Sequence, residues 1–386
     1  MKKRLNIIFI CFVGILTILL FFLPTGFDHE PNAPNVFREK SEILEVNNKN
    51  LEKIGPVTVG SQILEMKILS GAFIGDTVTA KNTLLGQMRL DKIFRKGDVV
   101  LSVVRLSKDG LKVEEARAQD IYRIPTMLIL FLLFALFLVG FARLIGLKAL
   151  ISFLFTGITI WKVLIPLLLK GYSPILVSLI VVFSITSVII LLVAGFSRKG
   201  LVALLGAQFG IFITFALAFL FGYLFRIPGS VVDFSEAIVY AGFGHLNLSD
   251  IFLSCIFISA SGAVMDVAMD IAASQNEISR QCLIISVRDM INSGFRVAYP
   301  VIGTMTTTLL FAYSGSFMFM FMLFMAKGIP AMSILNINYV AAEVMYTLVG
   351  SFGLVLVAPI TAIIGGIVFT SNSIQSKQAV GADVKM

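Results

Sequence analysis

Residues 175–194 read ILVSLIVVFSITSVIILLVA, an apolar run that contains no charged side chain. As an α-helix this run is about 30 Å long, which matches the hydrocarbon thickness of a lipid bilayer. Comparable apolar runs occupy much of the remaining chain, at 125–141, 149–169, 201–225, 251–272 and 344–369. The sequence therefore predicts a predominantly α-helical, polytopic membrane protein.

The composition of the whole chain supports a lipid environment. Of the 386 residues, 57% are apolar and 34 are Phe, and the mean hydropathy is +0.93, far outside the range of soluble domains. The net charge is +8, yet most of the surplus Lys and Arg lie in short loops between apolar runs, which is typical of orientation across a bilayer. We therefore expect the lipid bilayer as a partner and no nucleic acid.

Residues that bind metals, form disulfides or mark catalytic motifs are scarce. The three cysteines fall in or beside apolar runs, and the chain has only two histidines. The sequence contains no Walker motif, no G-x-S-x-G and no HExxH. We therefore expect no metal, no cofactor and no enzyme activity.

Residues 1–27 predict a signal-anchor helix. Three positive charges precede an apolar run over residues 5–24, which is long enough to span, and no small-x-small cleavage site follows. The positive residues place the N-terminus in the cytoplasm, so the next segment, 28–122, is expected to be extracytoplasmic.

Segment 28–122 carries strand patterns instead of apolar helices. The runs SEILEV, QILEMKIL, DTVTAK and GDVVLSVVRL alternate apolar and polar residues, and turn signals separate them. The tripeptide Lys108-Asp109-Gly110 lies before LKVEEARA and predicts a hairpin, because Asp-Gly tolerates the positive φ of tight turns. A small β-barrel of about five strands fits this length.

Residues 123–370 are expected to form the transmembrane bundle, and 371–386 a polar C-terminal tail. Basic residues follow alternate spans, on the side of the cytoplasmic N-terminus. Segment 226–250 is too polar to span and is interpreted as an outer interfacial helix. Segment 301–326 is either one tilted helix or two helices broken at residues 314–316. The total is therefore eight or nine spans, with nine favoured, and the side of the C-terminus stays open.

The most informative stretch for function is SGAVMDVAMDIAAS, residues 261–274. It places Asp266 and Asp270 one helical turn apart in or near a spanning helix, on a face that includes Ser259 and Ser274. Carboxylates at hydrocarbon depth are costly unless they are paired, protonated or facing water, so they indicate a path for cations or protons. The alternative is that both lie in cytoplasmic water or pair with basic residues to fasten helices.

A second group of candidates surrounds this stretch. Asn292, Thr306 and Thr307 could contribute to the same path, although intramembrane threonines more often bond to their own helix. The candidate charge partners are Arg280, Arg288, Asp289, Arg296 and Glu343. Gly206 and Gly210 form a GxxxG pattern, which favours close helix packing.

Three segments carry a family resemblance: VTVGSQILEMKILSGAFIGDTVTAKNTLLG, then SGAVMDVAMDIAAS, then the pair GTMTTTLLFAYSGS and LVGSFGLVLVAPITAII. Together they resemble the YibE/F-like family of bacterial multi-pass membrane proteins, over about residues 43–369. The resemblance implies a bacterial cell membrane. It supplies no mechanism, because the family has no established catalytic or binding residues.

Two hypotheses of function follow from the residues. The first is a cation- or proton-coupled transporter in which Asp266 and Asp270 carry the ion. The second is a membrane-anchored assembly or envelope scaffold, whose outer domain, 28–122, binds a protein partner. The substrate and the oligomeric state are not indicated by the sequence.

Overall fold

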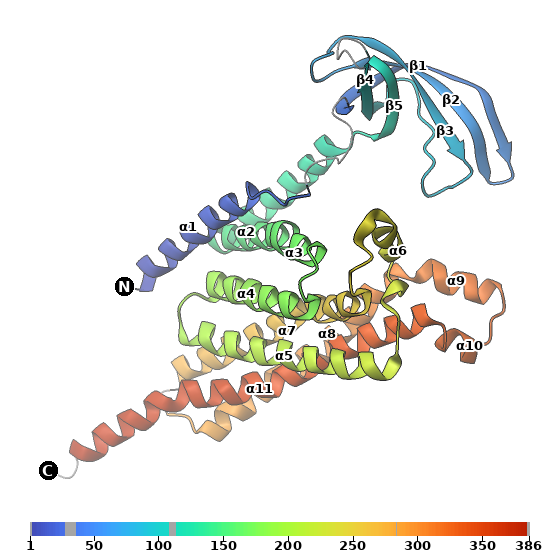
Figure 1. The fold of residues 1–386 in the computed structure, drawn as a ribbon. Helices are drawn as coiled ribbons and strands as arrows, with labels where there is room; N and C mark the ends of the chain where they lie inside the picture. Colours follow the sequence, from blue (N-terminus) through green and yellow to red (C-terminus); the bar gives the residue numbers. More distant parts are fainter. Residues whose placement is uncertain (1, 28–35, 108–112, 283, 384–386) are drawn as a thin grey trace. The chain divides into compact units, whose positions relative to one another are not determined.

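The computed structural model describes residues 2–27, 36–107, 113–282 and 284–383, with side chains described for 4–27 and up to residue 370 apart from Ser316. The chain divides into two compact units. One unit is Asp28–Phe137, and the other combines Met1–Phe27 with Leu138–Met386. Figure 1 labels the helices and strands of both units.

The first unit contains the small β-barrel that the alternating runs predict. Its strands are β1 (Val36–Ile54), β2 (Val57–Ile68), β3 (Thr77–Leu85), β4 (Val99–Leu106) and β5 (Val113–Ile121), and they close in the order β1-β2-β3-β5-β4. This five-stranded Greek-key closure, in which long β1 pairs with both β2 and β4, is the arrangement of an OB-fold.

The alternation of apolar residues along the strands builds the barrel core. In β2, Leu64, Met66 and Ile68 are fully buried, while Ile63, Glu65 and Lys67 between them are exposed. Successive side chains of a strand point to opposite faces, so one face of β2 fills the interior. β4 and β5 pair in antiparallel fashion as the hairpin prediction requires, although the turn at 108–110 itself lies outside the described residues.

The helical unit begins with the expected N-terminal helix, α1 (Lys2–Phe21). The next long helix, α2 (Ile124–Thr159), contains a break at Arg143, whose φ of 50° and ψ of −124° are not helical. A Cβ on Gly146 would collide with the carbonyl oxygen of Leu138, so the chain doubles back tightly here. This reversal separates the apolar runs predicted at 125–141 and 149–169. The second run continues through the π-turn η1 (Ile160–Leu164) into α3 (Ile165–Leu169).

The remaining long helices are α4 (Pro174–Ala194), α5 (Arg198–Phe225), α7 (Leu248–Gln281), α8 (Val287–Ser316) and α11 (Asn338–Asp383). Within the described residues six helices are long and apolar enough to cross a membrane, or up to seven if the bent pair α8 and α9 is one span. That number treats the folded-back stretch Ile124–Leu169 as one helix. α11 extends past residue 370 into the segment expected to be a polar tail.

Two connecting segments differ from the long helices. Residues 226–247, between α5 and α7, form only the short elements η2 (Gly229–Val231), α6 (Ser235–Ile238) and η3 (Val239–Phe243), which agrees with the prediction that segment 226–250 does not span. After α8 the chain bends by 65° into α9 (Met318–Ala326), followed by α10 (Ala331–Leu335).

The bend after α8 lies in segment 301–326, for which both one tilted helix and two broken helices were predicted. The chain is broken at Phe317, close to the expected position, but α9 has only 9 residues and ends before Lys327. Nine residues of helix extend about 14 Å, less than half of the hydrocarbon thickness. Segment 301–326 therefore contains the predicted break, and the helix that follows the break is too short to span a bilayer by itself.

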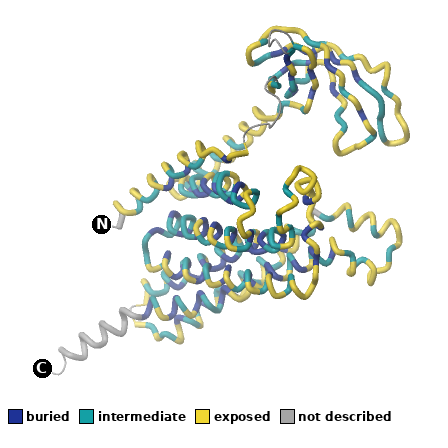
Figure 2. The backbone as a smooth tube through the Cα atoms, viewed as in Figure 1, coloured by how far each residue is buried: buried dark blue, intermediate teal, exposed yellow. Residues whose placement is uncertain are grey.

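The core of the helical unit lies where α5, α7 and α11 meet, and the buried residues gather there (Figure 2). Small residues permit this contact. A Cβ on Gly206 would collide with Thr361, and one on Gly210 would lie 2.7 Å from Val264 and 2.8 Å from Val357. The GxxxG pattern therefore serves helix packing, as predicted.

Candidate functional site

Helix α7 carries the two aspartates inside an unbroken helix. It starts after Asn247, whose side chain accepts a hydrogen bond from the Asp250 N–H, and it ends at Gln281. Asp266 and Asp270 lie 11 or more residues from its C-terminal end, so neither is in a loop. One face of α7 is fully buried, and the two aspartates lie on the exposed face together with Ser259. The predicted shared stripe is therefore present.

A cavity of about 270 Å³ opens beside this stripe, between α4, α7 and α8. Helix α4 contributes an aliphatic wall, while α7 and α8 contribute carboxylates and thioethers. The lining residues are Ile189, Ile190, Val193, Met265, Asp266, Met269, Asp270 and Met305. The cavity therefore combines an apolar wall with two acidic groups and three sulfur atoms.

The predicted charge partners do not pair with these carboxylates. Among the described residues, the structure contains no ion pair or hydrogen bond to Asp266 or Asp270, and none joins them to Arg280, Arg288 or Arg296. Asp289 has a local role instead. Its carboxylate accepts a hydrogen bond from the Ser286 hydroxyl at 2.6 Å, and its N–H donates to that hydroxyl at 3.1 Å, which caps the start of α8. The alternative that Asp266 and Asp270 hold helices together by ion pairs is therefore not supported in the described structure.

The remaining candidates of the second group also lie apart from the cavity. Thr306 donates to the Ile302 carbonyl at 2.8 Å and Thr307 to the Gly303 carbonyl at 3.0 Å, so both hydroxyls bond to their own helix. Ser274, half-buried, and Asn292, exposed, are not among the residues that line it.

A second polar cluster lies further along α7, toward its N-terminal half. The hydroxyls of Ser259 and Tyr346 are hydrogen-bonded, and Tyr346 donates to the Cys255 carbonyl at 2.7 Å. The ring of Tyr313 meets that of Tyr346 edge-on, with centroids 5.0 Å apart. Glu343, predicted as a charge partner, is half-buried, and its Oε1 is buried without a hydrogen-bond partner in the described structure. Residues from α7, α8 and α11 thus meet around one carboxylate.

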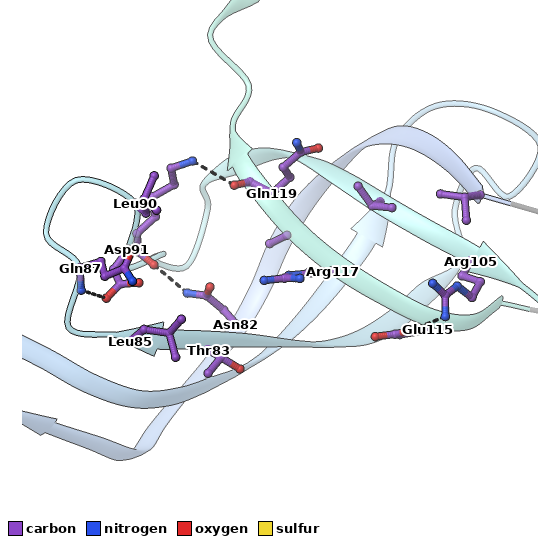
Figure 3. Close-up of a pocket in the computed structure, with 14 residues that line it drawn as sticks. Asn82, Thr83, Leu85, Gln87, Leu90, Asp91, Arg105, Glu115, Arg117 and Gln119 are labelled. Atoms are coloured by element: carbon purple, nitrogen blue, oxygen red, sulfur yellow. Dashed lines mark hydrogen bonds and ion pairs between the residues drawn. The ribbon is translucent and has the colours of Figure 1, made fainter. Parts of the chain in front are cut away.

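The barrel contains a larger pocket of about 540 Å³. Within the described residues, the parallel neighbours β3 and β5 pair at one position, Ala80 with Ala116, and residues of both strands line the pocket. Figure 3 shows the loop residues Gln87 and Asp91 at one end of this pocket and the Arg105–Glu115 ion pair, at 3.5 Å, at the other. The pocket leaves room for a ligand at the barrel surface.

A network of charged side chains lies next to this pocket, at the end of β5. The Asp120 carboxylate accepts hydrogen bonds from Lys92 at 2.5 Å, from the Ile121 N–H at 2.7 Å and from Arg123 at 2.7 Å. Partial burial raises the pKa of Asp120, but these three hydrogen bonds lower it by more, so the pKa lies below its ordinary value. The side chain is therefore charged at neutral pH and ties the end of β5 to the loop before β4.

The helical unit identifies the chain. A family model described as YibE/F-like protein matches residues 130–371. The chain belongs to the YibE/F-like family. Comparisons with curated proteins and with solved structures gave no match.

The YibE/F-like match covers the whole 270 Å³ cavity and the cluster around Tyr346, and it leaves the barrel outside. The part of this YibE/F-like protein that family membership defines is therefore the helical unit with both polar clusters.

Sequence reasoning missed two kinds of residue in this YibE/F-like protein, tyrosines and methionines. Tyr313 and Tyr346 lie on different helices, and no spacing in the sequence relates them. The thioethers were also missed, although Met265 and Met269 precede the two aspartates directly in the sequence. The Met-Asp pair repeats after four residues, so the sequence already indicated that both thioethers lie near the aspartates. Met305 on α8, by contrast, joins the cavity only through the fold.

Proposed function

We propose that this YibE/F-like protein is an integral membrane protein that moves protons or other cations along the open face of α7. The observation that carries the proposal is that Asp266 and Asp270, without partners in the described structure, line a cavity of about 270 Å³. A charged carboxylate at the centre of a spanning helix costs about 2.5–3.5 kcal/mol. Because of this cost, an ionisable residue within a membrane span is by default a candidate functional residue.

The depth of the cavity supports this proposal. Its α4 wall consists of Ile189, Ile190 and Val193, and α4 ends one residue later at Ala194. The basic pair Arg198 and Lys199 then starts α5. The cavity therefore lies within about two turns of the charged end of the bundle. At that depth water can reach it from one side while the rest of its wall is apolar.

A contact between α1 and the α4–α5 loop supports an orientation of the helical unit in the membrane. The Asn6 side chain accepts a hydrogen bond from the Phe196 N–H at 3.2 Å. The positive N-terminus and the basic residues after α4 are therefore at the same end of the helical unit. By the positive-inside rule this end is cytoplasmic, so the cavity opens toward the cytoplasm and the barrel is extracytoplasmic.

The cluster around Tyr346 extends the polar face away from that end. Ser259 lies seven residues before Asp266, which is two helical turns or about 10 Å along the same face of α7. Tyr346 bonds to Ser259, and Tyr313 and Glu343 lie close to Tyr346. Polar groups from three helices thus continue the path beyond the aspartates.

The test is proton movement in proteoliposomes that contain the full chain and a pH dye. Gradients of H⁺, Na⁺, K⁺ or Ag⁺ are imposed one at a time. We expect the wild type to move protons under at least one gradient, and the Asp266→Asn, Asp270→Asn double variant to behave like empty liposomes. Asp233→Asn is the matched control, because Asp233 is exposed in the short turns before α7. Wild-type flux in the double variant contradicts the proposal, and so does a wild type that dissipates none of the imposed gradients.

The scaffold hypothesis has one observation in its favour, the pocket of about 540 Å³ on the barrel. In that function the barrel binds a protein partner, and the helices only anchor it. Deletion of residues 30–119 separates the two functions. A transporter retains part of its flux after this deletion. A scaffold loses its crosslinked partner, and its function does not depend on Asp266 and Asp270.

A further inference from the structure

We propose that the cavity between α4, α7 and α8 is a binding site for a soft monovalent cation, Cu(I) or Ag(I). Met265, Met269 and Met305 provide the thioether ligands, and Asp266 and Asp270 provide the negative charge. The inference deepens the proposed function and rests on it, because it names the cation that the path carries.

The donors are arranged in two matching levels along α7. Met265 and Asp266 are followed one helical turn later by Met269 and Asp270, so each level presents one sulfur and one carboxylate to the cavity. Met305 belongs to α8 and lines the cavity with them. Ligands therefore come from two helices, which permits a cation to be enclosed and also passed from one level to the next.

The three methionines do not fill the space beside them. All three are only half-buried, although each also packs against the main core of the helical unit. The remaining 270 Å³ compares with about 30 Å³ for one water molecule, so the cavity has room for an ion and several waters. The α4 wall is aliphatic and offers no ligand. Any ion here is bound by thioethers and carboxylates.

These ligand types select a soft cation. Thioethers prefer Cu(I), whereas Na⁺, Mg²⁺ and Ca²⁺ need oxygen ligands, which for Ca²⁺ number six to eight. Two carboxylates are too few for the Ca²⁺ shell. None of these three hard ions uses thioethers, which outnumber the carboxylates in the cavity. Among the described residues there is no group of three His, Cys, Asp or Glu side chains that could hold a metal, so a zinc-type site is not available either.

The charges also fit a monovalent ion. One monovalent cation and one proton together neutralise two carboxylates. Release of the cation toward one side can then be matched by binding of a second proton, without any change in the oxidation state of the metal. Exchange of a soft cation for protons is therefore compatible with the path along α7.

The experiment measures Ag⁺ binding to the full chain in detergent, by equilibrium dialysis in a large excess of Na⁺ and K⁺. All proteins carry Cys11→Ala, Cys255→Ala and Cys282→Ala, because thiolates also bind Ag⁺. We expect the Met265→Leu, Met269→Leu, Met305→Leu triple variant to bind Ag⁺ more than about 100-fold more weakly, since loss of even outer-shell partners costs about 10- to 100-fold. Leu conserves volume and is tolerated in packed cores.

A matched control is present on α9. Met318, Met322 and Met325 line another cavity that has no carboxylate. Their replacement by Leu should leave the Ag⁺ affinity unchanged. If the first triple variant binds Ag⁺ as the wild type does, the soft-cation site is ruled out, while the carboxylate path is judged separately by the Asp266→Asn, Asp270→Asn flux measurement.

A second measurement does not depend on variants. X-ray absorption at the copper edge, on the cysteine-free protein loaded with Cu(I), should show sulfur neighbours, which can then come only from methionine. A copper shell that contains only oxygen or nitrogen overturns the proposal.

Discussion

The side-chain amide of Gln275 donates to the main-chain oxygen of Ala362, 2.9 Å away across the interface between α7 and α11. The same nitrogen donates to the Met290 carbonyl of α8, also at 2.9 Å. Gln275 is fully buried, and it lies nine residues after Asp266, half a helical rotation away. This contact on the buried face of α7 therefore holds Asp266 and Asp270 toward the cavity on the other face.

Replacement of Gln275 by Leu should lower the stability of the helical unit by about 1–3 kcal/mol. The physical reason is the loss of two buried hydrogen bonds, which are worth about 0.5–1.5 kcal/mol each. Thermal unfolding in detergent measures the effect. Gln281→Leu, at the exposed end of the same helix, is the control and should change little. An unchanged melting temperature for Gln275→Leu would show that the contact does not orient α7.

Two glycines make room for this amide. A Cβ on Gly365 would collide with the Gln275 Oε1, and one on Gly294 would lie 2.6 Å from the Gln275 Nε2. Gly365→Ala should therefore destabilise the protein by about 1–3 kcal/mol, because overpacking of a buried site forces neighbours to move. The control is Gly262→Ala, which meets nothing within 4 Å and should be neutral or slightly stabilising. Equal melting temperatures for the two variants would show that the missing side chain of Gly365 is not needed to accommodate Gln275.

The depth of the aspartates can be measured by cysteine labelling in a cysteine-free background. Asp270→Cys should react with a water-soluble thiol reagent from the cytoplasmic side faster than Asp266→Cys, because it is one turn nearer the end of α7. Both should react more slowly than Glu277→Cys, which is exposed two turns beyond Asp270. If all three label at the same rate, the carboxylates lie in bulk water and the proposed cation path has no basis.

The Asp120 network predicts a pH dependence for the barrel. The pKa of Asp120 is lower in the folded state than its ordinary value, so its contribution is present above pH 3.8 and is lost as the pH falls through the lower folded pKa. The side chain is one-third exposed, so solvent screening limits this contribution to less than about 1 kcal/mol.

Hydrogen exchange of β5 amides, followed by mass spectrometry between pH 5 and pH 2.5, tests this dependence. Asp120→Asn should remove the extra protection at the upper end of that range, whereas Glu114→Gln, exposed on the same strand, should not. A pH profile that is identical in wild type and Asp120→Asn would refute the network's role.

Local patterns predicted most elements of both units. Apolar runs near 20 residues long predict helices because no other structure satisfies the backbone in lipid, and the alternation in QILEMKIL predicts a strand because side chains there switch faces at every residue. The Asp266 and Asp270 stripe was predictable for the same reason, since four residues are about one turn of a helix. The reversal at Arg143 was indicated as well, because it separates the apolar runs predicted at 125–141 and 149–169. The short length of α9 was not indicated, because the sequence on both sides of its ends remains apolar.

By itself, the sequence determined that this chain has long apolar helices, a five-stranded barrel after the first helix, and two carboxylates on one helical face, because hydrophobic period and length are local properties. Only the tertiary structure decided which face of α7 stays open, that Met305 joins Met265 and Met269, and that Tyr346 bonds to Ser259. In a helix that is apolar on all sides, the sequence pattern does not indicate which side packs against other helices. These contacts therefore depend on residues far away in the chain.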